Sequence, residues 1–293
     1  MSFLNRYKEY YSRNGEKFEI FKGNIWREYN KMVMPLGPVK FNYSLQKEDA
    51  EALLQKFSSA LLVRCTNGFN TKISGEWYAI ICNKFRDISE LSAKNRSEIK
   101  RGFKNCKISM VDAKFIAENG FEVYISAFER YKGVKKPSIT EKEYRERMLQ
   151  TKDFDDIIHY WGVFYGDKLI GYSQNYIFDK IEVNYSTVKF DPKFLSLYPS
   201  YALFYTMNKS YLEEEHFEYV NDGFRNILHE TNIQKYLIDK FSFQRAYTDL
   251  NIFYRPYLSI YLTLTFPFRG FLRKISRRLD ALYTLEEIRR NDE

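Results

Sequence analysis

The sequence predicts an α/β (α+β) fold in which helices flank a mixed, mostly antiparallel sheet. Apolar and polar residues alternate over Trp161–Tyr165 and again over Leu169–Ile177, and the turn pair Gly166-Asp167 separates the two stretches. A third strand is expected over Ile181–Phe190, and Asp191-Pro192 ends it because proline donates no hydrogen bond to a strand ladder. Helical and extended patterns alternate in the residues that follow.

Two helices and two further strands are expected after this three-strand pattern. Pro199 lies at the start of a helix whose apolar positions, from Leu203 to Tyr211, recur at helical spacing. A short strand, a second helix and a last strand are expected over Phe217–Val220, Asn232–Phe241 and Phe243–Tyr247. The predicted order is therefore three antiparallel strands, helix, strand, helix, strand.

The first half of the chain also mixes helical and extended patterns. Helices are expected over Gln46–Phe57, Asp87–Phe103 and Ala113–Tyr131, and another begins at the capping pair Thr140 and Glu143. Short strands are expected within Phe18–Val33 and over Ala60–Arg64, Trp77–Ile81 and Lys107–Val111. We therefore expect an N-terminal α/β domain over residues 1–106, a second domain over 107–267 and a basic amphipathic helix over 268–293.

Composition narrows the class of protein. Of the 293 residues 44% are hydrophobic, which is enough for a packed core, and the 25 Tyr and 25 Phe either fill that core or line a cleft for an acyl or sugar-like ligand. Three cysteines without CxxC spacing disfavour disulfides and zinc, and we expect no metal. The longest nearly apolar stretch, Tyr257–Phe268, is shorter than the about 20 residues of a membrane-spanning helix. With no signal peptide visible, we expect a soluble, cytoplasmic protein.

The net charge of +8 is concentrated in two basic clusters. The first contains Lys94, Arg96, Lys100, Arg101, Lys104 and Lys107, and the second contains Arg269, Arg273, Lys274, Arg277 and Arg278. Each cluster either attracts a polyanion, such as RNA, an anionic membrane or a nucleotide-linked substrate, or forms a solvated helix face.

The element order resembles the core of the GNAT acyltransferase superfamily. Trp161–Ser173, with Ile170-Gly171-Tyr172 near its end, is similar to the hairpin formed by that family's second and third strands. The basic helix Leu91–Lys104 resembles a stretch of FemAB-like aminoacyltransferases and BioF2-like acetyltransferase domains. Because those proteins carry two GNAT-like domains in tandem, the resemblance implies an acyltransferase domain over 107–267 and a degenerate GNAT-like repeat over 1–106.

The resemblance implies direct acetyl or aminoacyl transfer, in a ternary complex, to an amine or hydroxyl acceptor such as a cell-envelope or polysaccharide precursor. The donor would be acyl-CoA (acetyl-CoA) or aminoacyl-tRNA, and Ser200, Tyr201 and Lys189 are the candidate cofactor-binding residues. The sequence departs from the family at Leu195–Ala202, which lacks the phosphate-binding glycines, and at Ile238, where many members have a tyrosine acid. A donor other than CoA, or an inactive binding protein that holds a polyanionic or membrane partner, therefore stays open.

The densest polar segment, Asn221–Asn232, follows a strand and leads into a helix, which is where open α/β sheets place ligands. Asp222, His229 and Glu230 are candidates for acid or base, and Asn221 and Arg225 for binding the substrate. An ordinary Asp-Gly turn and a core histidine are the competing interpretation. On the third strand, Glu182 and Tyr185 are a candidate base and acid on opposite registers, and the sequence does not decide which register faces the cleft.

The C-terminal residues 268–279 suggest a separate hypothesis, contact with a membrane surface. The apolar residues of 268–279 fall on one helical face, and basic residues occupy the remainder. Such a helix either contacts a membrane surface or docks on its own domain. Membrane contact would place the protein peripherally at the inner membrane face and would favour a lipid-linked acceptor.

Overall fold

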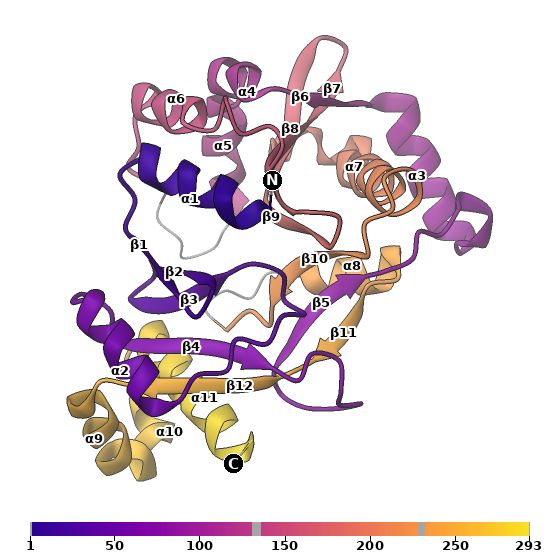
Figure 1. The fold of residues 1–293 in the computed structure, drawn as a ribbon. Coiled ribbons are helices and arrows are strands. Elements are labelled where there is room, and N and C mark those ends of the chain that lie inside the picture. Colours follow the sequence, from indigo (N-terminus) through magenta and orange to yellow (C-terminus); the bar gives the residue numbers. More distant parts are fainter. Residues whose placement is uncertain (1, 131–135, 228–231, 293) are drawn as a thin grey trace. The chain divides into compact units, whose positions relative to one another are not determined.

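The computed structural model describes residues 2–130, 136–227 and 232–292 (Figure 1). Its helices are α1 (Phe3–Arg13), α2 (Lys47–Lys56), α3 (Ala93–Asn105), α4 (Ala113–Asn119), α5 (Phe121–Ala127), α6 (Glu141–Leu149), α7 (Pro199–Asn208), α8 (Ile233–Phe241), α9 (Pro256–Thr265), α10 (Arg269–Leu272) and α11 (Arg277–Asp292). Its strands are β1 (Phe18–Phe21), β2 (Asn24–Tyr29), β3 (Met32–Leu36), β4 (Leu62–Asn67), β5 (Tyr78–Cys82), β6 (Lys107–Val111), β7 (Ile158–Tyr165), β8 (Lys168–Phe178), β9 (Glu182–Phe190), β10 (Tyr219–Phe224), β11 (Gln244–Tyr247) and β12 (Asp249–Tyr254).

The chain forms two compact units, and each is assembled from three separate segments. Unit 1 contains Met1–Tyr10, Ile81–Gly223 and Lys235–Gln244, and unit 2 contains Tyr11–Ile80, Phe224–Gln234 and Arg245–Glu293. These units differ from the continuous ranges 1–106, 107–267 and 268–293 expected from the sequence. The difference arises because β12 pairs with β4 along its whole length, from Asp249 opposite Asn67 to Tyr254 opposite Leu62.

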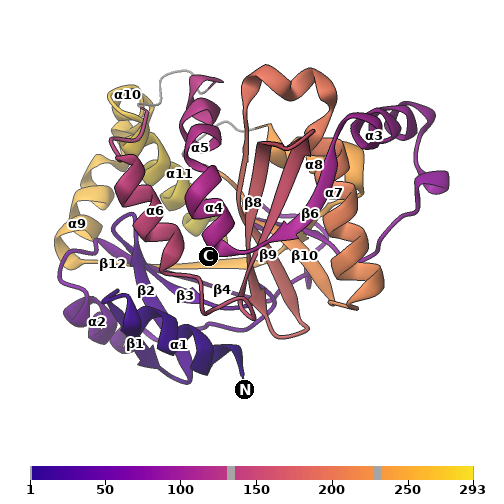
Figure 2. The same ribbon diagram turned by 90° about the horizontal axis from the view of Figure 1, so that it is seen from above.

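Unit 1 is built on a seven-stranded sheet of order β11-β5-β10-β9-β8-β7-β6, and the division into units falls within β5, β10 and β11. Strands β6 to β9 pair antiparallel, and β10 pairs with β9 in parallel. Helices α4 to α6 lie on one face of this sheet and α7 lies on the other (Figure 2). The expected mixed, mostly antiparallel sheet flanked by helices is confirmed, and so is the expected order of its elements.

Local sequence signals set several helix ends in unit 1. Thr140 Oγ1 accepts the Glu143 backbone N–H, and the Glu143 carboxylate accepts the Thr140 N–H, so α6 begins at the predicted capping box. Pro199 is the first residue of α7, where a missing N–H costs nothing. Helix α7 buries Leu203, Phe204 and Met207 and then continues into a π-helical turn, Lys209–Glu214.

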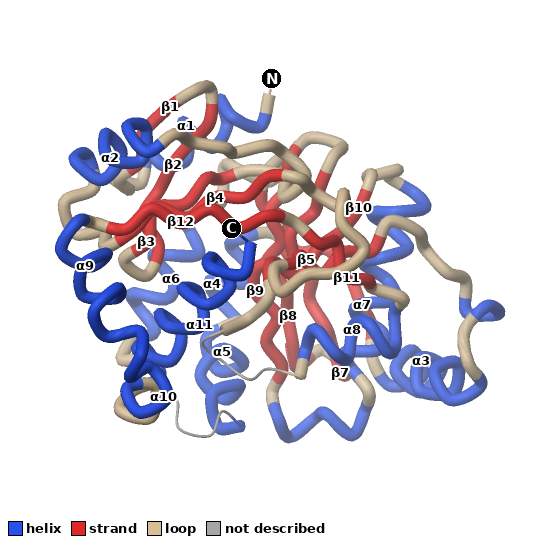
Figure 3. The backbone as a smooth tube through the Cα atoms, turned by 90° about the horizontal axis from the view of Figure 1, so that it is seen from below, coloured by secondary structure: helices blue, strands red, loops and turns tan. Residues whose placement is uncertain are grey.

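Unit 2 contains a five-stranded sheet of order β1-β2-β3-β4-β12. Strands β1 to β3 form an antiparallel meander, α2 follows, and β4 then pairs in parallel with β3. The same order, meander, helix, parallel strand, recurs in unit 1 as β7-β8-β9, α7 and β10. The first half of the chain thus repeats the core pattern of the second, as expected for a degenerate tandem repeat. Strands β4 and β12 run side by side in Figure 3.

From Phe268 onward, where the sequence predicted one helix, the structure has two helices, α10 and α11, and α9 precedes them. Helix α10 ends at Leu272, and four residues, 273–276, separate it from α11. Tyr283 of α11 is fully buried against Leu258 and Leu262 of α9, and its hydroxyl donates to Thr265 Oγ1 at 2.7 Å. Across the described residues, no helix is long and apolar enough to cross a membrane.

Candidate functional site

The parallel ladder between β9 and β10 ends in the middle of both strands. It pairs Glu182 with Tyr219 and continues only as far as Asn184 opposite Asn221. Strand β9 nevertheless runs on to Phe190, and β10 runs on to Phe224. Beyond this point, backbone groups on the β10 side of β9 have no strand partner in the described ladder, so they are placed to bind something else.

A β-bulge lies immediately beyond the end of that ladder. On the opposite edge of β9, Gln174 of β8 pairs with Thr187 and Tyr176 pairs with Asn184. Tyr185 and Ser186 therefore stand opposite Asn175 alone, which is one extra residue in β9. A bulge leaves one residue out of the ladder, bends the strand and redirects its side chains, and bulges are frequent beside active sites.

The bulge decides which side chains share a face, a question that the sequence left open. Asn184 pairs with Tyr176 and Lys189 pairs with Tyr172, so Lys189 lies on the Glu182 face although its position number is odd. The Lys189 ammonium lies 4.5 Å from the centre of the Phe128 ring, beside α5, and burial lowers its pKa. Tyr185 lies on the opposite face, against Phe204 of α7.

Four polar side chains line the paired part of β9 and β10. The fully buried Glu182 carboxylate accepts a hydrogen bond of 2.7 Å from the Tyr219 hydroxyl. Asn184 Nδ2 donates to Asn221 Oδ1 at 2.8 Å, and that oxygen also accepts the Gly223 N–H at 2.7 Å. Asn221 Nδ2 is buried without a hydrogen-bond partner in the described part of the chain. A buried donor of this kind is stabilised when a ligand oxygen accepts from it, which suits the predicted substrate-binding role of Asn221.

The α7 face of β9 carries a second polar cluster, centred on Tyr211 in the π-helical turn. Its hydroxyl accepts from Trp161 Nε1 at 2.8 Å and from Asn175 Nδ2 at 3.2 Å, and it lies 3.1 Å from His159 Nδ1. The Tyr185 hydroxyl donates to Asn208 Oδ1 at 2.8 Å, and burial raises the pKa of Tyr185 well above its ordinary value. This phenol therefore keeps its proton near neutral pH.

Ser200 and Tyr201 lie at the start of α7, where protein groups already occupy much of the helix end. The Ser200 hydroxyl accepts from the Tyr236 hydroxyl of α8 at 3.0 Å, and the Tyr201 N–H bonds to Tyr198 O. Helix α3 approaches so closely that a Cβ on Gly102 would lie 2.8 Å from the Tyr198 carbonyl oxygen. Since Pro199 has no N–H, few backbone donors remain for the phosphate predicted here.

The remaining predicted residues fall in several places. Asp222 follows Asn221 on β10, is half-buried and interacts electrostatically with Tyr185. Arg225 belongs to unit 2, where its guanidinium donates to the Glu76 carbonyl at 2.9 Å and pairs with the Glu76 carboxylate at 3.4 Å. His229 and Glu230 lie outside the described residues. The described ranges bring together no cluster of His, Cys, Asp or Glu that would hold a metal ion.

Sequence reasoning missed Asn175, Asn184, Asn208 and Tyr211. Asn175 belongs to the polar run Ser173-Gln174-Asn175 inside an otherwise mostly apolar strand, and that run was the available signal for buried polar groups. Tyr211 looked like an ordinary apolar helix position because its spacing from Leu203 is helical.

Comparison with known proteins identifies the fold. No protein-family model and no curated protein matches this sequence. Among solved structures, FemX aligns over 88% of this chain and 93% of its own, with a TM-score of 0.55 and 10% identity. The C-terminal domain of a protein described as a lysylphosphatidylglycerol synthetase, from Agrobacterium fabrum, aligns over 84% of this chain and 90% of its own, with a TM-score of 0.50 and 10% identity.

A conserved protein of unknown function from Bacteroides thetaiotaomicron also aligns, over 85% of this chain and 88% of its own, with a TM-score of 0.51 and 11% identity. Identities this low establish a shared fold and nothing more. The chain therefore has the same overall fold as FemX.

Proposed function

We propose that this protein is an acyltransferase that moves an aminoacyl group directly from its donor to an amine or hydroxyl acceptor. The observation that carries the proposal is the bulge at Tyr185 and Ser186, beside the point where the β9–β10 ladder ends. Backbone N–H groups freed there would polarise the donor carbonyl and stabilise the negative charge that develops on its oxygen.

Glu182 is the proposed general base. The acceptor nitrogen or oxygen attacks the donor carbonyl carbon, the new C–N or C–O bond forms, and the donor's ester C–O bond breaks. The acceptor proton passes to the Glu182 carboxylate, directly or through one water, and then to the departing ribose oxygen of the donor. Tyr219 would act as a positioning residue because its hydroxyl holds one oxygen of that carboxylate.

Three features support an aminoacyl-tRNA donor over acyl-CoA. The start of α7, where a CoA pyrophosphate would be expected, is covered by α3 and by Tyr236. The resemblance to FemAB-like aminoacyltransferases points to the same donor. The name lysylphosphatidylglycerol synthetase describes the making of an aminoacyl lipid by one structural neighbour. A cell-envelope precursor is the proposed acceptor class.

The basic face of α3 supplies a surface for the tRNA. Arg96, Lys100, Arg101 and Lys104 line an open depression of about 350 Å³, together with Ala93 and Ser97. A cationic helix face of this kind binds phosphodiester backbones without reading their sequence. If the protein bound tRNA through this face but transferred nothing, it would be the inactive binding protein that the sequence left open.

A donor panel tests the function. Purified full-length protein is incubated with charged tRNA or with acetyl-CoA and a mixture of amine and hydroxyl acceptors, and new acyl products are measured by mass spectrometry. We expect products from charged tRNA only. Products from acetyl-CoA alone would overturn the donor assignment, and tRNA binding without any product would overturn the enzyme assignment.

Substitution of Glu182 and of Asp222 tests the mechanism. We expect Glu182→Gln to lower kcat by about 10²–10⁴, the usual contribution of a general base, with little change in tRNA affinity. Glu213→Gln, at an exposed position of the π-helical turn, is the matched control and should leave kcat unchanged. A larger loss from Asp222→Asn than from Glu182→Gln would assign the base to Asp222 instead.

A further inference from the structure

The C-terminal segment of unit 2 exposes a concentrated set of large apolar side chains, here called the apolar surface. Its members are Tyr257, Ile260, Tyr261, Leu264, Phe268, Phe271 and Ile275, exposed by 38% to 72%. On α9, Ile260, Tyr261 and Leu264 lie three, four and seven positions after Tyr257. The four side chains therefore form one stripe along that helix. The opposite side of α9 buries Leu258 and Leu262 against Tyr283.

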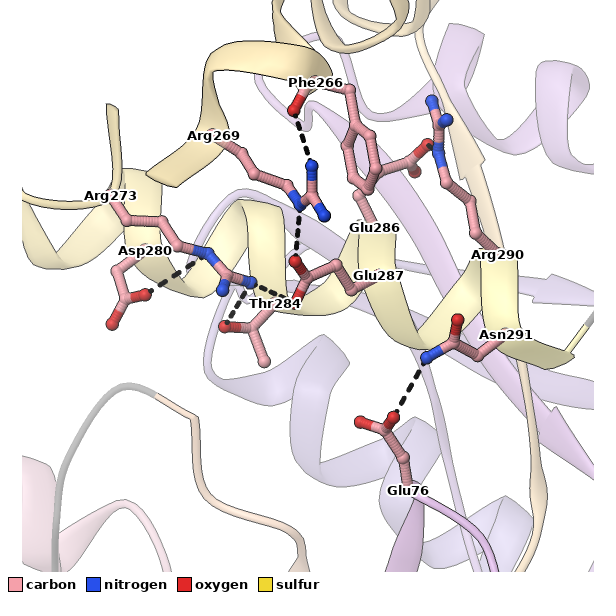
Figure 4. Close-up of polar contacts among 10 residues, drawn as sticks. All are labelled: Glu76, Phe266, Arg269, Arg273, Asp280, Thr284, Glu286, Glu287, Arg290 and Asn291. Carbon is pink, nitrogen blue, oxygen red and sulfur yellow. Dashed lines mark hydrogen bonds and ion pairs between the residues drawn. The ribbon is translucent and has the colours of Figure 1, made fainter. Parts of the chain in front are cut away.

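Between residues 256 and 278, this segment carries positive charge and no negative charge. Residues 256–278 contain five Lys or Arg and no Asp or Glu. Two of the five hold α10 to α11 (Figure 4): Arg269 Nε donates to Glu287 Oε1 at 2.6 Å, and Arg273 Nη2 donates to Glu287 Oε2 at 2.5 Å. Arg273 also lies 3.7 Å from an Asp280 carboxylate oxygen.

The other three cations are not part of this network. Lys274, Arg277 and Arg278 are exposed, and among the described residues their side chains form no ion pair or hydrogen bond. They lie three, six and seven residues after Phe271, and Lys274 adjoins Ile275. Exposed aromatic and aliphatic side chains next to uncompensated cations are the composition of a surface that enters the headgroup region of an anionic membrane.

We propose that the apolar surface docks this protein on an anionic membrane leaflet, with Lys274, Arg277 and Arg278 contacting lipid phosphates. The protein would bind at the membrane surface, because α9 has ten residues and is about 15 Å long, which is too short to cross a bilayer. A second copy of the chain fits this surface less well. A symmetric dimer would place the same three cations near one another.

The structure divides the apolar residues of 268–279 between two roles. Leu272 and Leu279 pack against the cluster around Tyr283, whereas Phe268, Phe271 and Ile275 remain exposed. The segment therefore docks on its own unit through one side and presents the other. Helix α9 extends the presented side, which the sequence did not anticipate. This inference does not rest on the proposed transferase activity.

Vesicle co-sedimentation of the full-length protein tests the proposal. We expect binding to vesicles of phosphatidylcholine with phosphatidylglycerol and much weaker binding to phosphatidylcholine alone. Each basic residue near a membrane contributes about a fivefold increase in binding, so Lys274→Gln/Arg277→Gln/Arg278→Gln should lower the partition coefficient about 100-fold. The matched control, Lys94→Gln/Lys100→Gln/Lys104→Gln, removes the same charge from α3 and should bind almost as the wild type does.

A second pair of variants tests the apolar contribution. Leu264→Ser/Phe271→Ser should abolish vesicle binding, whereas Ile73→Ser, at a side chain exposed by 99%, should not. Equal losses from the two charge triples would show non-specific attraction and overturn the proposal. It would also be overturned if the wild-type protein failed to sediment with anionic vesicles, or if it formed a dimer that Leu264→Ser/Phe271→Ser converts to a monomer.

Discussion

Tyr211 holds a buried polar cluster together through a single hydroxyl. Trp161, Asn175 and His159 come from β7 and β8, and each of them places a nitrogen within 3.2 Å of that oxygen. The π-helical turn brings Tyr211 to this point, and such turns inside helices are frequent near functional sites. Because Asn175 is also the residue opposite the bulge, the hydroxyl helps to fix the geometry of β9 where the carbonyl is proposed to bind.

We expect Tyr211→Phe to lower the free energy of unfolding by about 2–4 kcal/mol, because it leaves two buried N–H donors without an acceptor. Urea unfolding followed by circular dichroism measures the change. Tyr165→Phe removes a hydroxyl from an exposed side chain and should change stability by less than about 0.5 kcal/mol. Equal losses from both variants would contradict the role assigned to Tyr211.

His159 makes this cluster sensitive to pH. Burial lowers its pKa, which the nearby Lys180 also favours and Glu215 opposes. The folded protein therefore binds a proton at this site less readily than the unfolded chain does. The stability that the neutral His159 contributes is fully present above the unfolded pKa of about 6.5. The free energy of unfolding falls as the pH drops below that value.

We expect the free energy of unfolding to decrease between about pH 7 and pH 5, and His159→Gln to reduce that decrease. Denaturant unfolding at several pH values provides the measurement. His216→Gln, which removes an exposed imidazole, serves as the control. An unchanged pH profile in the His159 variant would show that other groups cause the dependence.

At the residue scale, the structure places four of the predicted site residues on or beside the β9–β10 ladder. Glu182 is in its first pair and Asn221 in its last, and Tyr185 and Asp222 each follow the last pair by one residue. Their faces were not predictable, because the bulge after Asn184 shifts the alternation and a bulge has no signature in a single sequence. Arg225 was grouped with them by proximity in the chain, yet the chain passes into unit 2 after Gly223.

At the scale of elements, α3 packs closely against α7 at Gly102. A Cβ on Gly102 would meet the Tyr198 carbonyl oxygen at 2.8 Å and the Ala202 backbone nitrogen at 3.1 Å. Glycine lets the two helices approach until their backbones touch, and the start of α7 is covered as a result.

Gly102→Ala should destabilise the protein by about 1–3 kcal/mol, because the backbone of α7 has to move, even though alanine favours a helix by about 1 kcal/mol. Gly270→Ala in α10 is a matched control, because a Cβ there would meet nothing within 4 Å. Thermal unfolding distinguishes the two. A Gly102→Ala protein as stable as the wild type would show that α3 and α7 separate easily.

Element prediction succeeded where periodicity was strong and local. The three strands β7 to β9 agree with the alternation, and α7 begins at Pro199 as expected. Strand β12 was missed because only Thr248 separates it from β11, so the two strands look like one stretch. The break between α10 and α11 was missed because it accompanies tertiary contacts of Arg273, which local propensity does not reveal.

At the scale of the whole molecule, the three cysteines report on the integrity of the fold. All three are buried and unpaired, and burial raises the pKa of Cys65 to about 12 and that of Cys106 to about 11. Burial also raises the pKa of Cys82. At pH 8 the thiolate fraction of Cys65 and Cys106 is on the order of one in a thousand or less.

We expect all three thiols to react slowly with a thiol-specific chromogenic reagent in the native protein and rapidly after unfolding. Stopped-flow absorbance in buffer and in denaturant gives the two rates. Rapid reaction of one thiol in the native protein would show that its surroundings open locally, and Cys→Ser variants would identify it.

The fold class was predictable because the element order of one unit is contiguous over β7 to β10. The division into units was not, because the pairing of β12 with β4 joins residues such as Leu62 and Tyr254 that are far apart in the chain. No local sequence pattern predicts a strand partner that is so far away in the chain.

This interleaving of segments has a consequence for synthesis. A ribosome releases the chain from its N-terminus, yet unit 1 needs Lys235–Gln244 and unit 2 needs Arg245–Glu293. Neither unit can close early, and the edge of β4 that will receive β12 stays open during most of translation. Loss of the last 45 or so residues would therefore remove β12 and leave that edge of β4 without its strand partner.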